Sequence, residues 1–197
     1  MFVCNLITDP TAPRLGVSLV ESLRSAWCGG HVKWLSPNEA AEFQVSTMPE
    51  NFWDVWAEFQ ILGVDLIIQP LAGRRKAILL ADMDSTMIQQ ECIDELAIMA
   101  GVGNRVERIT ARAMNGELDF EMSVVERVAL LKGLPESIIS EVLASRISFM
   151  PGGLTLLATM KANGAYAALV SGGFTAFTAS VSNRLGFDEH RANILQV

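Results

Sequence analysis

The chain has 197 residues, half of them hydrophobic, which is enough material for one sizeable domain or two small ones. Lysine and arginine number 15 against 22 aspartates and glutamates, and the resulting net charge of −7 argues against non-specific nucleic-acid binding, which needs a basic face. A phosphorylated substrate remains compatible with this charge, because a few local cations or one metal ion can override the global sign.

The first 73 residues alternate strand and helix signals. The order β-α-β-β-α-β is that of a ferredoxin-like unit, with strands predicted at 2–7, 32–35, 41–45 and 64–69 and helices following residue 15 and Pro49. ACT-like small-molecule-binding modules use this arrangement, but so do many unrelated proteins, so no function follows from it. We expect residues 1–73 to form a small α+β domain with Trp53, Trp56 and Phe59 in its core.

A glycine and three cations, Gly73 to Lys76, are typical of a linker and place the domain boundary near residue 73. The apolar run 77–81 that follows predicts a buried strand, since it is short and bounded by charge and turn formers. Four short helices are then predicted between about residues 88 and 149. So many helices after one strand indicate an inserted cap rather than a simple crossover.

The α/β pattern resumes after Pro151-Gly152-Gly153. A helix is predicted at 154–163, a buried strand at 165–170, a helix at 174–185 and a last strand at 192–197. This order predicts a parallel, Rossmannoid sheet with right-handed crossovers for residues 77–197.

The three cysteines, Cys4, Cys28 and Cys92, are widely separated and have no CxxC spacing, which is typical of free thiols in a reducing compartment. No apolar run approaches the ~18 residues of a membrane helix, and the start of the chain lacks the charged and apolar segments of a signal peptide. We therefore expect a soluble, cytoplasmic protein without a membrane partner.

Two aspartates follow the strand at 77–81, where ligands bind in open parallel sheets. Asp82 and Asp84 are two residues apart, so on an extended backbone both side chains leave the same face. Adjacent carboxylates repel unless a cation or a reaction uses both. Both could reach one Mg2+, and one could attack phosphorus while the other handles the proton of the leaving group. Thr86 could orient one of them.

Ser171 ends the strand at 165–170, and Gly172-Gly173 offers backbone N–H groups at the start of a helix, which is a phosphate-binding arrangement. In the cap, Glu91 could hold an ammonium group, and Arg127, with Met114 and Phe120 upstream, could hold a carboxylate. An amino-acid substrate needs both charges.

Three segments resemble the phosphoserine phosphatases of the haloacid-dehalogenase (HAD) superfamily: DMDSTMIQQECIDELA (82–97), AMNGELDFEMSVVERV (113–128) and LVSGGFT (169–175). The resemblance runs from about residue 77 to the end of the chain. It implies a HAD-like core with a helical cap and Mg2+-dependent hydrolysis of O-phospho-L-serine to L-serine and phosphate, the last step of serine biosynthesis.

The resemblance also implies residue roles. Asp82 would be the nucleophile that becomes an aspartyl phosphate, and Asp84 would act as the acid and then the base. Both would bind Mg2+, Asp84 through its backbone carbonyl. Substrate would contact the cap and the second strand end, through Glu91, Met114, Phe120, Arg127, Ser171 and Gly172.

The family continues with a lysine that clamps the phosphoryl group and a GDGxND strand end that supplies a metal ligand. The chain stops before both, so we expect it to be a fragment with an incomplete sheet, weakly active or inactive.

Two alternatives stay open. The site could act on another small phosphomonoester or transfer phosphate to an alcohol. The chain could also be a non-catalytic, amino-acid-binding regulatory fragment that works through residues 1–73. A homodimer is compatible with the sequence, which does not fix the oligomeric state.

Overall fold

A computed structural model describes residues 1–196, except for the side chains of Met114 and Phe120. The chain divides into two compact units, residues 1–75 and the part from Lys76 onward. Each unit has a separate hydrophobic core.

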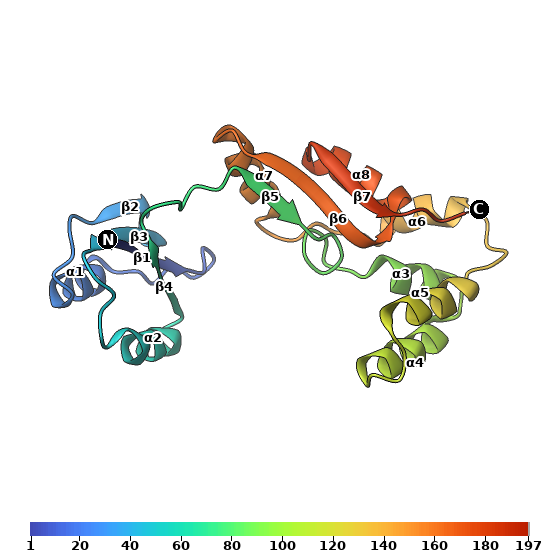
Figure 1. The fold of residues 1–197 in the computed structure, drawn as a ribbon, viewed down its shortest axis with the longest axis horizontal. Coiled ribbons are helices and arrows are strands. Elements are labelled where there is room, and N and C mark those ends of the chain that lie inside the picture. Colours follow the sequence, from blue (N-terminus) through green and yellow to red (C-terminus); the bar gives the residue numbers. More distant parts are fainter. Residues whose placement is uncertain (197) are drawn as a thin grey trace. The chain divides into compact units, whose positions relative to one another are not determined.

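The first unit is a four-stranded antiparallel sheet with two helices. Its strand order is β2-β3-β1-β4, which is the order of a ferredoxin-like unit. Both helices pack on one face of the sheet (Figure 1). The elements are β1 (Phe2–Thr8), α1 (Val17–Ala26), β2 (Lys33–Ser36), β3 (Ala40–Val45), α2 (Phe52–Ile61) and β4 (Val64–Pro70).

The core of this unit lies between the helices and alternate residues of the strands. Leu6 and Phe43 are among its fully buried members, and Phe59 packs with them. The prediction that Trp53 and Trp56 also lie in the core is wrong, since they are 66% and 38% exposed. Helix α2 turns Phe52 and Phe59 toward the sheet, and this leaves the two indoles on its outer flank.

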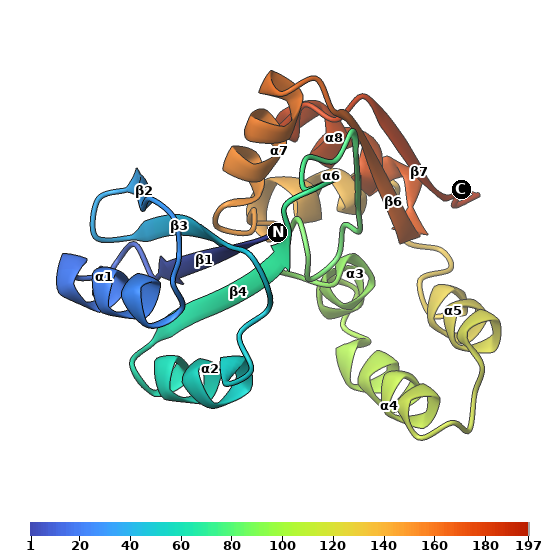
Figure 2. The ribbon, with the colours of Figure 1, turned by 60° about the vertical axis from the view of Figure 1, so that its left-hand side comes forward.

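The second unit is built on a three-stranded parallel sheet in the order β5-β6-β7. The strands are β5 (Ile78–Ala81), β6 (Tyr166–Phe174) and β7 (Glu189–Asn193). Helices α7 (Gly153–Ala162) and α8 (Thr175–Leu185) cover one face, as Figure 2 shows, and bury Leu157, Phe177 and Val181 against it. The fold is the HAD-like α/β architecture that the sequence predicts.

The prediction that the strand at 77–81 is buried is wrong for three of its five residues, Ala77, Ile78 and Leu80. Ile78 and Leu80 are 66% and 68% exposed, whereas Ala81 on the other side is buried. The reason is the position of β5, which pairs only with β6 and whose outward face has no covering helix among the described residues. Tyr166 and Val170 of β6 share this exposed face.

Two boundaries also differ from the predicted ones. Strand β6 continues through Ser171-Gly172-Gly173 to Phe174, so these residues extend a strand rather than form a turn at a helix start. The last strand covers Glu189–Asn193 instead of 192–197, and Val197 lies outside the described residues. The prediction followed the apolar residues near the end of the chain, whereas the residues that pair with β6 at the edge of the sheet are the polar ones of β7.

Four helices separate β5 from α7. They are α3 (Cys92–Met99), α4 (Gly103–Met114), α5 (Phe120–Ala129) and α6 (Ser137–Ser145). Helices α3 and α6 share the main core with the sheet, through Leu96 and Val142. Helices α4 and α5 lie farther from the sheet (Figure 2). Within the described part of the chain, no helix has the length and apolar character needed to cross a membrane.

The separate cores predict separate unfolding transitions. All four tryptophans lie in the first unit, so their fluorescence monitors that unit alone. Replacing the fully buried Phe177 by alanine should lower the stability of the second unit by about 3–5 kcal/mol. In urea titrations, the circular dichroism transition should shift while the fluorescence transition stays in place. The matched variant Phe43→Ala should shift the fluorescence transition and leave the circular dichroism change of the second unit in place. Equal shifts of both signals in the Phe177→Ala variant would mean that the two units unfold together.

Candidate active site

The candidate site begins at the turn that follows β5. The Met83 side chain is fully buried, and its carbonyl oxygen accepts hydrogen bonds from the backbone N–H groups of Thr86, Met87 and Ile88. This tight turn leaves the neighbouring aspartates on the side opposite to Met83. Asp82 is exposed and Asp84 is half-buried.

Asp84 joins two parts of the second unit. One of its carboxylate oxygens accepts a hydrogen bond from the backbone N–H of Cys92, the first residue of α3, at 2.8 Å. The other accepts from the Ser171 hydroxyl of β6 at 3.0 Å. An anionic side chain at the first turn of a helix also interacts favourably with the helix dipole. The carboxylate is therefore fixed by both the cap and the sheet.

Ser171 and Gly173 shape the second wall of the site. The parallel pairing of Ala81 with Leu169 brings the end of β5 next to Ser171. The backbone N–H of Gly173 donates to the Ser171 hydroxyl at 2.9 Å, so this donor is already used. A Cβ at Gly173 would lie 3.1 Å from both the Asp84 carboxylate and the Ser171 hydroxyl. A side chain here would crowd this contact, and the Asp84 and Ser171 side chains would have to shift to accept it.

Glu91 enters the site from the start of α3. Its carboxylate accepts a hydrogen bond from the Ser85 hydroxyl at 2.7 Å. Ser85 has a left-handed backbone with φ of 51°, and its N–H donates to the carbonyl oxygen of Gln90. Thr86, by contrast, has an exposed side chain that makes no hydrogen bond with any described residue.

A cavity of about 200 Å³ lies between these groups. It brings together six of the eight predicted site residues: Asp82, Asp84, Glu91, Arg127, Ser171 and Gly172. Arg127 comes from α5, where its Nε donates to the carbonyl oxygen of Ser123 at 3.2 Å. The side chains of Met114 and Phe120, which were also predicted, lie outside the described residues. The cavity carries acidic groups on the strand-end side and one cation on the cap side.

Sequence reasoning missed several groups around the cavity. The N–H of Cys92 is one of them, because its contact with Asp84 is set by the fold and no residue type marks it. Ser85 was a visible polar neighbour of the aspartates, but its contact with Glu91 depends on its unusual backbone conformation. Ile93, Val124 and Phe174 add apolar lining.

Burial shifts the pKa values of two further groups near the start of α3, the Asp94 carboxyl and the Cys92 thiol. Burial raises the pKa of the Asp94 carboxyl above its usual 3.8, while the nearby Arg127 cation opposes this shift. Burial, reinforced by the Asp84 carboxylate, raises the pKa of the Cys92 thiol, so this cysteine stays protonated and unreactive.

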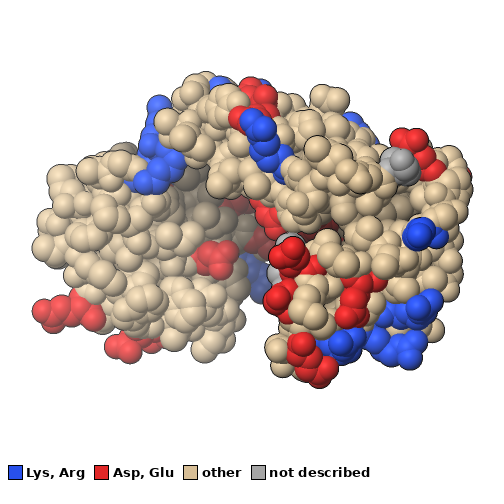
Figure 3. Space-filling view, turned by 45° about the vertical axis from the view of Figure 1, so that its right-hand side comes forward, with Lys and Arg blue, Asp and Glu red and all other residues tan. Residues whose placement is uncertain are grey.

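On the face drawn in Figure 3, acidic and basic side chains mix at the lower right, at the height of α4 in Figure 1. Helix α4 carries Arg105, Arg108 and Arg112, and Arg112 forms ion pairs with Glu117 and Glu126. Part of this basic surface is thus neutralised locally. Arg127, inside the cavity, makes no ion pair with any described side chain within 4.0 Å.

The oxygen atoms at the end of β5 fit a small hard cation. One Asp82 carboxylate oxygen accepts from the Met83 N–H at 2.7 Å, and the other has no hydrogen-bond partner in residues 1–196. Mg2+ is commonly held by one or two protein carboxylates, with water and substrate phosphate completing its shell. The described residues contain no group of three or more His, Cys, Asp or Glu side chains suited to a metal ion. The donor set therefore fits a sparsely held Mg2+ rather than an all-protein metal cage.

The haloacid dehalogenase-like hydrolase family matches residues 79–196, which is more than half of the chain. The chain therefore belongs to this family. The matched range contains the paired aspartates, the cap and Ser171.

Curated relatives are similar to a longer part of the chain. A phosphoserine phosphatase of Archaeoglobus fulgidus is 42% identical over 142 residues, covering 71% of the chain and 41% of the relative. A phosphoserine phosphatase of Streptomyces coelicolor is 42% identical over 165 residues, covering 82% of the chain and 40% of the relative. The chain thus spans about 40% of the length of these relatives.

Solved structures agree with the fold. A HAD family hydrolase from Salmonella enterica serovar Typhi superposes with a TM-score of 0.82 at 27% identity, covering all of this chain and 68% of the other. A substrate-bound phosphoserine phosphatase gives a TM-score of 0.58 at 39% identity, covering 63% of this chain and 59% of the other.

The raised pKa of Asp94 predicts a pH-dependent stability effect. Below pH 3.8 the carboxyl is protonated in both the folded and the unfolded state and costs nothing. As the pH rises through the higher folded pKa, burial of the charge destabilises the fold. Asp94→Asn should therefore raise the midpoint of thermal unfolding at pH 7, and the gain should vanish near pH 3. The exposed Asp65→Asn serves as the control. An equal gain at both pH values would contradict this explanation.

Proposed function

We propose that the protein is a Mg2+-dependent phosphomonoesterase that releases L-serine and phosphate from O-phospho-L-serine. The observation that carries this proposal is that one cavity is lined by Asp82, Asp84, Glu91, Arg127 and Ser171 together. It combines a paired-carboxylate strand end with one anion and one cation on the cap. Relatives called phosphoserine phosphatases, similar over 71–82% of the chain, support the same substrate.

The reaction proceeds in two steps. An oxygen of Asp82 attacks phosphorus, the bond from phosphorus to the serine oxygen breaks, and Asp84 gives its proton to that oxygen. Water then attacks the phosphorus of the aspartyl phosphate, Asp84 takes the proton from the water, and the Asp82 carboxylate leaves. The contacts of Asp84 with the Cys92 N–H and the Ser171 hydroxyl support a fixed position for this acid and base.

Substrate selection follows from the charges on the cap side. Glu91 would pair with the substrate ammonium group, and Arg127 would pair with its carboxylate. Met114 and Phe120 would cover the substrate, and Ser171 and Gly172 would contact its phosphate. The free oxygen of Asp82 and the backbone carbonyl of Asp84 would hold Mg2+, which supplies positive charge that neutralises the two aspartates and the phosphoryl group.

Loss of the nucleophile tests the chemistry. Asp82→Asn should abolish phosphate release from O-phospho-L-serine, because an amide cannot form the aspartyl phosphate. The more sensitive measurement is mass spectrometry of the protein after incubation with substrate and Mg2+. The unaltered chain should yield a phosphorylated peptide that contains Asp82, and the variant should not. Phosphate release that survives in the variant would show that another group is the nucleophile.

Removal of the cap cation tests the substrate. Arg127→Ala should raise KM for O-phospho-L-serine by about 10–100-fold, since a hydrogen-bonded charge contributes about 1.5–3 kcal/mol. It should leave KM for phosphoethanolamine unchanged, because that ester has the ammonium group but no carboxylate. Arg127→Lys keeps the charge and should lie between the two. If Arg127→Ala changes KM for both esters equally, the amino-acid substrate is wrong and another small phosphomonoester takes its place.

A further inference from the structure

The two segments that connect the cap to the sheet pair with each other, and we call residues 87–90 and 146–150 the neck. Ile88 and Phe149 form an antiparallel bridge. Backbone hydrogen bonds flank it, from Gln89 N–H to the Ser148 carbonyl at 3.0 Å and from Met150 N–H to the Met87 carbonyl at 3.0 Å. The start and the end of the cap are thus tied together at one place.

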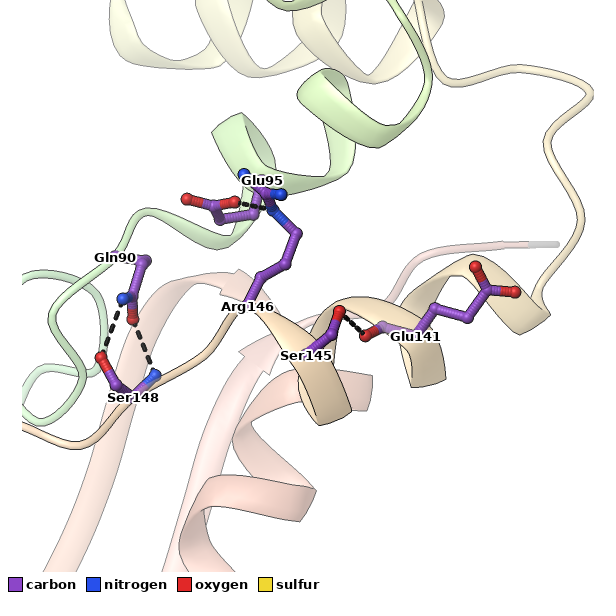
Figure 4. Close-up of polar contacts among 6 residues, drawn as sticks. All are labelled: Gln90, Glu95, Glu141, Ser145, Arg146 and Ser148. Carbon is purple, nitrogen blue, oxygen red and sulfur yellow. Dashed lines mark hydrogen bonds and ion pairs between the residues drawn. The ribbon is translucent and has the colours of Figure 1, made fainter.

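A side-chain clamp strengthens this neck (Figure 4). The Gln90 amide nitrogen donates to the Ser148 hydroxyl at 2.8 Å, and the Gln90 amide oxygen accepts from the Ser148 backbone N–H at 2.9 Å. One side chain therefore engages both the hydroxyl and the backbone N–H of a single residue 58 positions away. Such a two-point contact fixes direction as well as distance.

The clamp acts one residue away from the candidate site. Glu91 follows Gln90 directly, and its carboxylate accepts from the Ser85 hydroxyl at 2.7 Å. The Gln90 carbonyl oxygen accepts from the Ser85 N–H at 3.2 Å, which closes a loop of residues 85–90 directly after Asp84. Any rotation of residue 90 would therefore move both Glu91 and the backbone next to Asp84.

A second contact restrains the same helix one turn later. Glu95 of α3 forms an ion pair with Arg146 from the other segment of the neck, also visible in Figure 4. Glu91 is the N-cap residue of α3, and Glu95 lies in the first turn of the helix that Glu91 begins. The first turn of α3 is thus held against residues 146–148 at both of its ends.

We propose that the Gln90–Ser148 clamp is a positioning element that sets the Glu91 carboxylate in the wall of the cavity. The clamp touches no substrate itself and acts through Glu91 and Ser85. Its consequence for substrates rests on the proposed function: with Glu91 held in place, the site prefers phosphomonoesters that carry an ammonium group.

Four variants test this role. Gln90→Ala removes both contacts and should raise KM for O-phospho-L-serine about tenfold, and Ser148→Ala removes one contact and should raise it about threefold. Ser148→Thr keeps the hydroxyl and should restore the original value. The matched control is Ser145→Ala, because the Ser145 hydroxyl donates only within its own helix, to the carbonyl oxygen of Glu141. None of these changes should affect KM for 3-phosphoglycerate, which has a hydroxyl in place of the ammonium group.

Amide hydrogen exchange, measured by NMR on the same chain, gives an answer that does not depend on turnover. Gln90→Ala should accelerate exchange of the Ser85 and Cys92 N–H groups about tenfold, since these donate to Gln90 and Asp84. Ser145→Ala should leave both rates unchanged. Unchanged rates in Gln90→Ala would overturn the proposal whatever the substrate.

The kinetic outcomes separate the two proposals. In Gln90→Ala, exchange could be faster while KM rises equally for O-phospho-L-serine and 3-phosphoglycerate. That result would overturn the positioning of Glu91 and leave a purely structural role for the clamp. If the unaltered chain binds neither ester in calorimetry, the proposed function fails, and the exchange rates alone support or overturn the clamp.

Discussion

The second unit depends on one carboxylate, that of Asp84, because it joins segments that are far apart in the chain. It receives one hydrogen bond from the first residue of the cap and another from the middle of the sheet. Burying a carboxylate, even by half, lowers the stability of the fold unless hydrogen-bond donors surround it. The donors here are a helix start and a hydroxyl that is itself fixed by the Gly173 N–H. The Asp84 carboxylate, which we propose as the acid and base, thus also connects the cap to the sheet.

The two faces of the sheet that carries this carboxylate contact are covered unequally. One face buries Ala167 and Leu169 under α7 and α8, while the other exposes Ile78, Leu80 and Tyr166. Parallel strands are usually covered on both faces. Even so, the end of β5 that precedes Asp82 lies beside the part of β6 that precedes Ser171, because the pairing of these strands depends on backbone hydrogen bonds and on the packed face. The geometry of the site therefore needs only the covered half of this sheet.

Local sequence was sufficient for most of the fold and for six members of the cavity. Strong periodicity located the helices, and polar residues directly after apolar strands located Asp82 and Ser171, since the strand ends of a parallel sheet share one edge. The predictions that were wrong concern features that depend on tertiary structure. Exposure of Leu80 depends on which neighbours β5 has, and exposure of Trp53 depends on the rotation of α2. The Ser85–Glu91 contact requires a positive φ at serine, which residue type alone does not announce.

The four cap helices are not equally attached, and this bears on how the two charges of the cap work. Helices α3 and α6 place Leu96, Ile139 and Val142 in the same core as the sheet, whereas the described side chains of α5 that join it, such as Val128, are partly buried. Local stability follows shared buried contacts, so α4 and α5 are the least restrained part of the cap. Glu91 therefore belongs to the firmly held part and Arg127 to the loosely held part. A substrate with both an ammonium and a carboxylate group would link the two parts, and a ligand with only one of these charges would not.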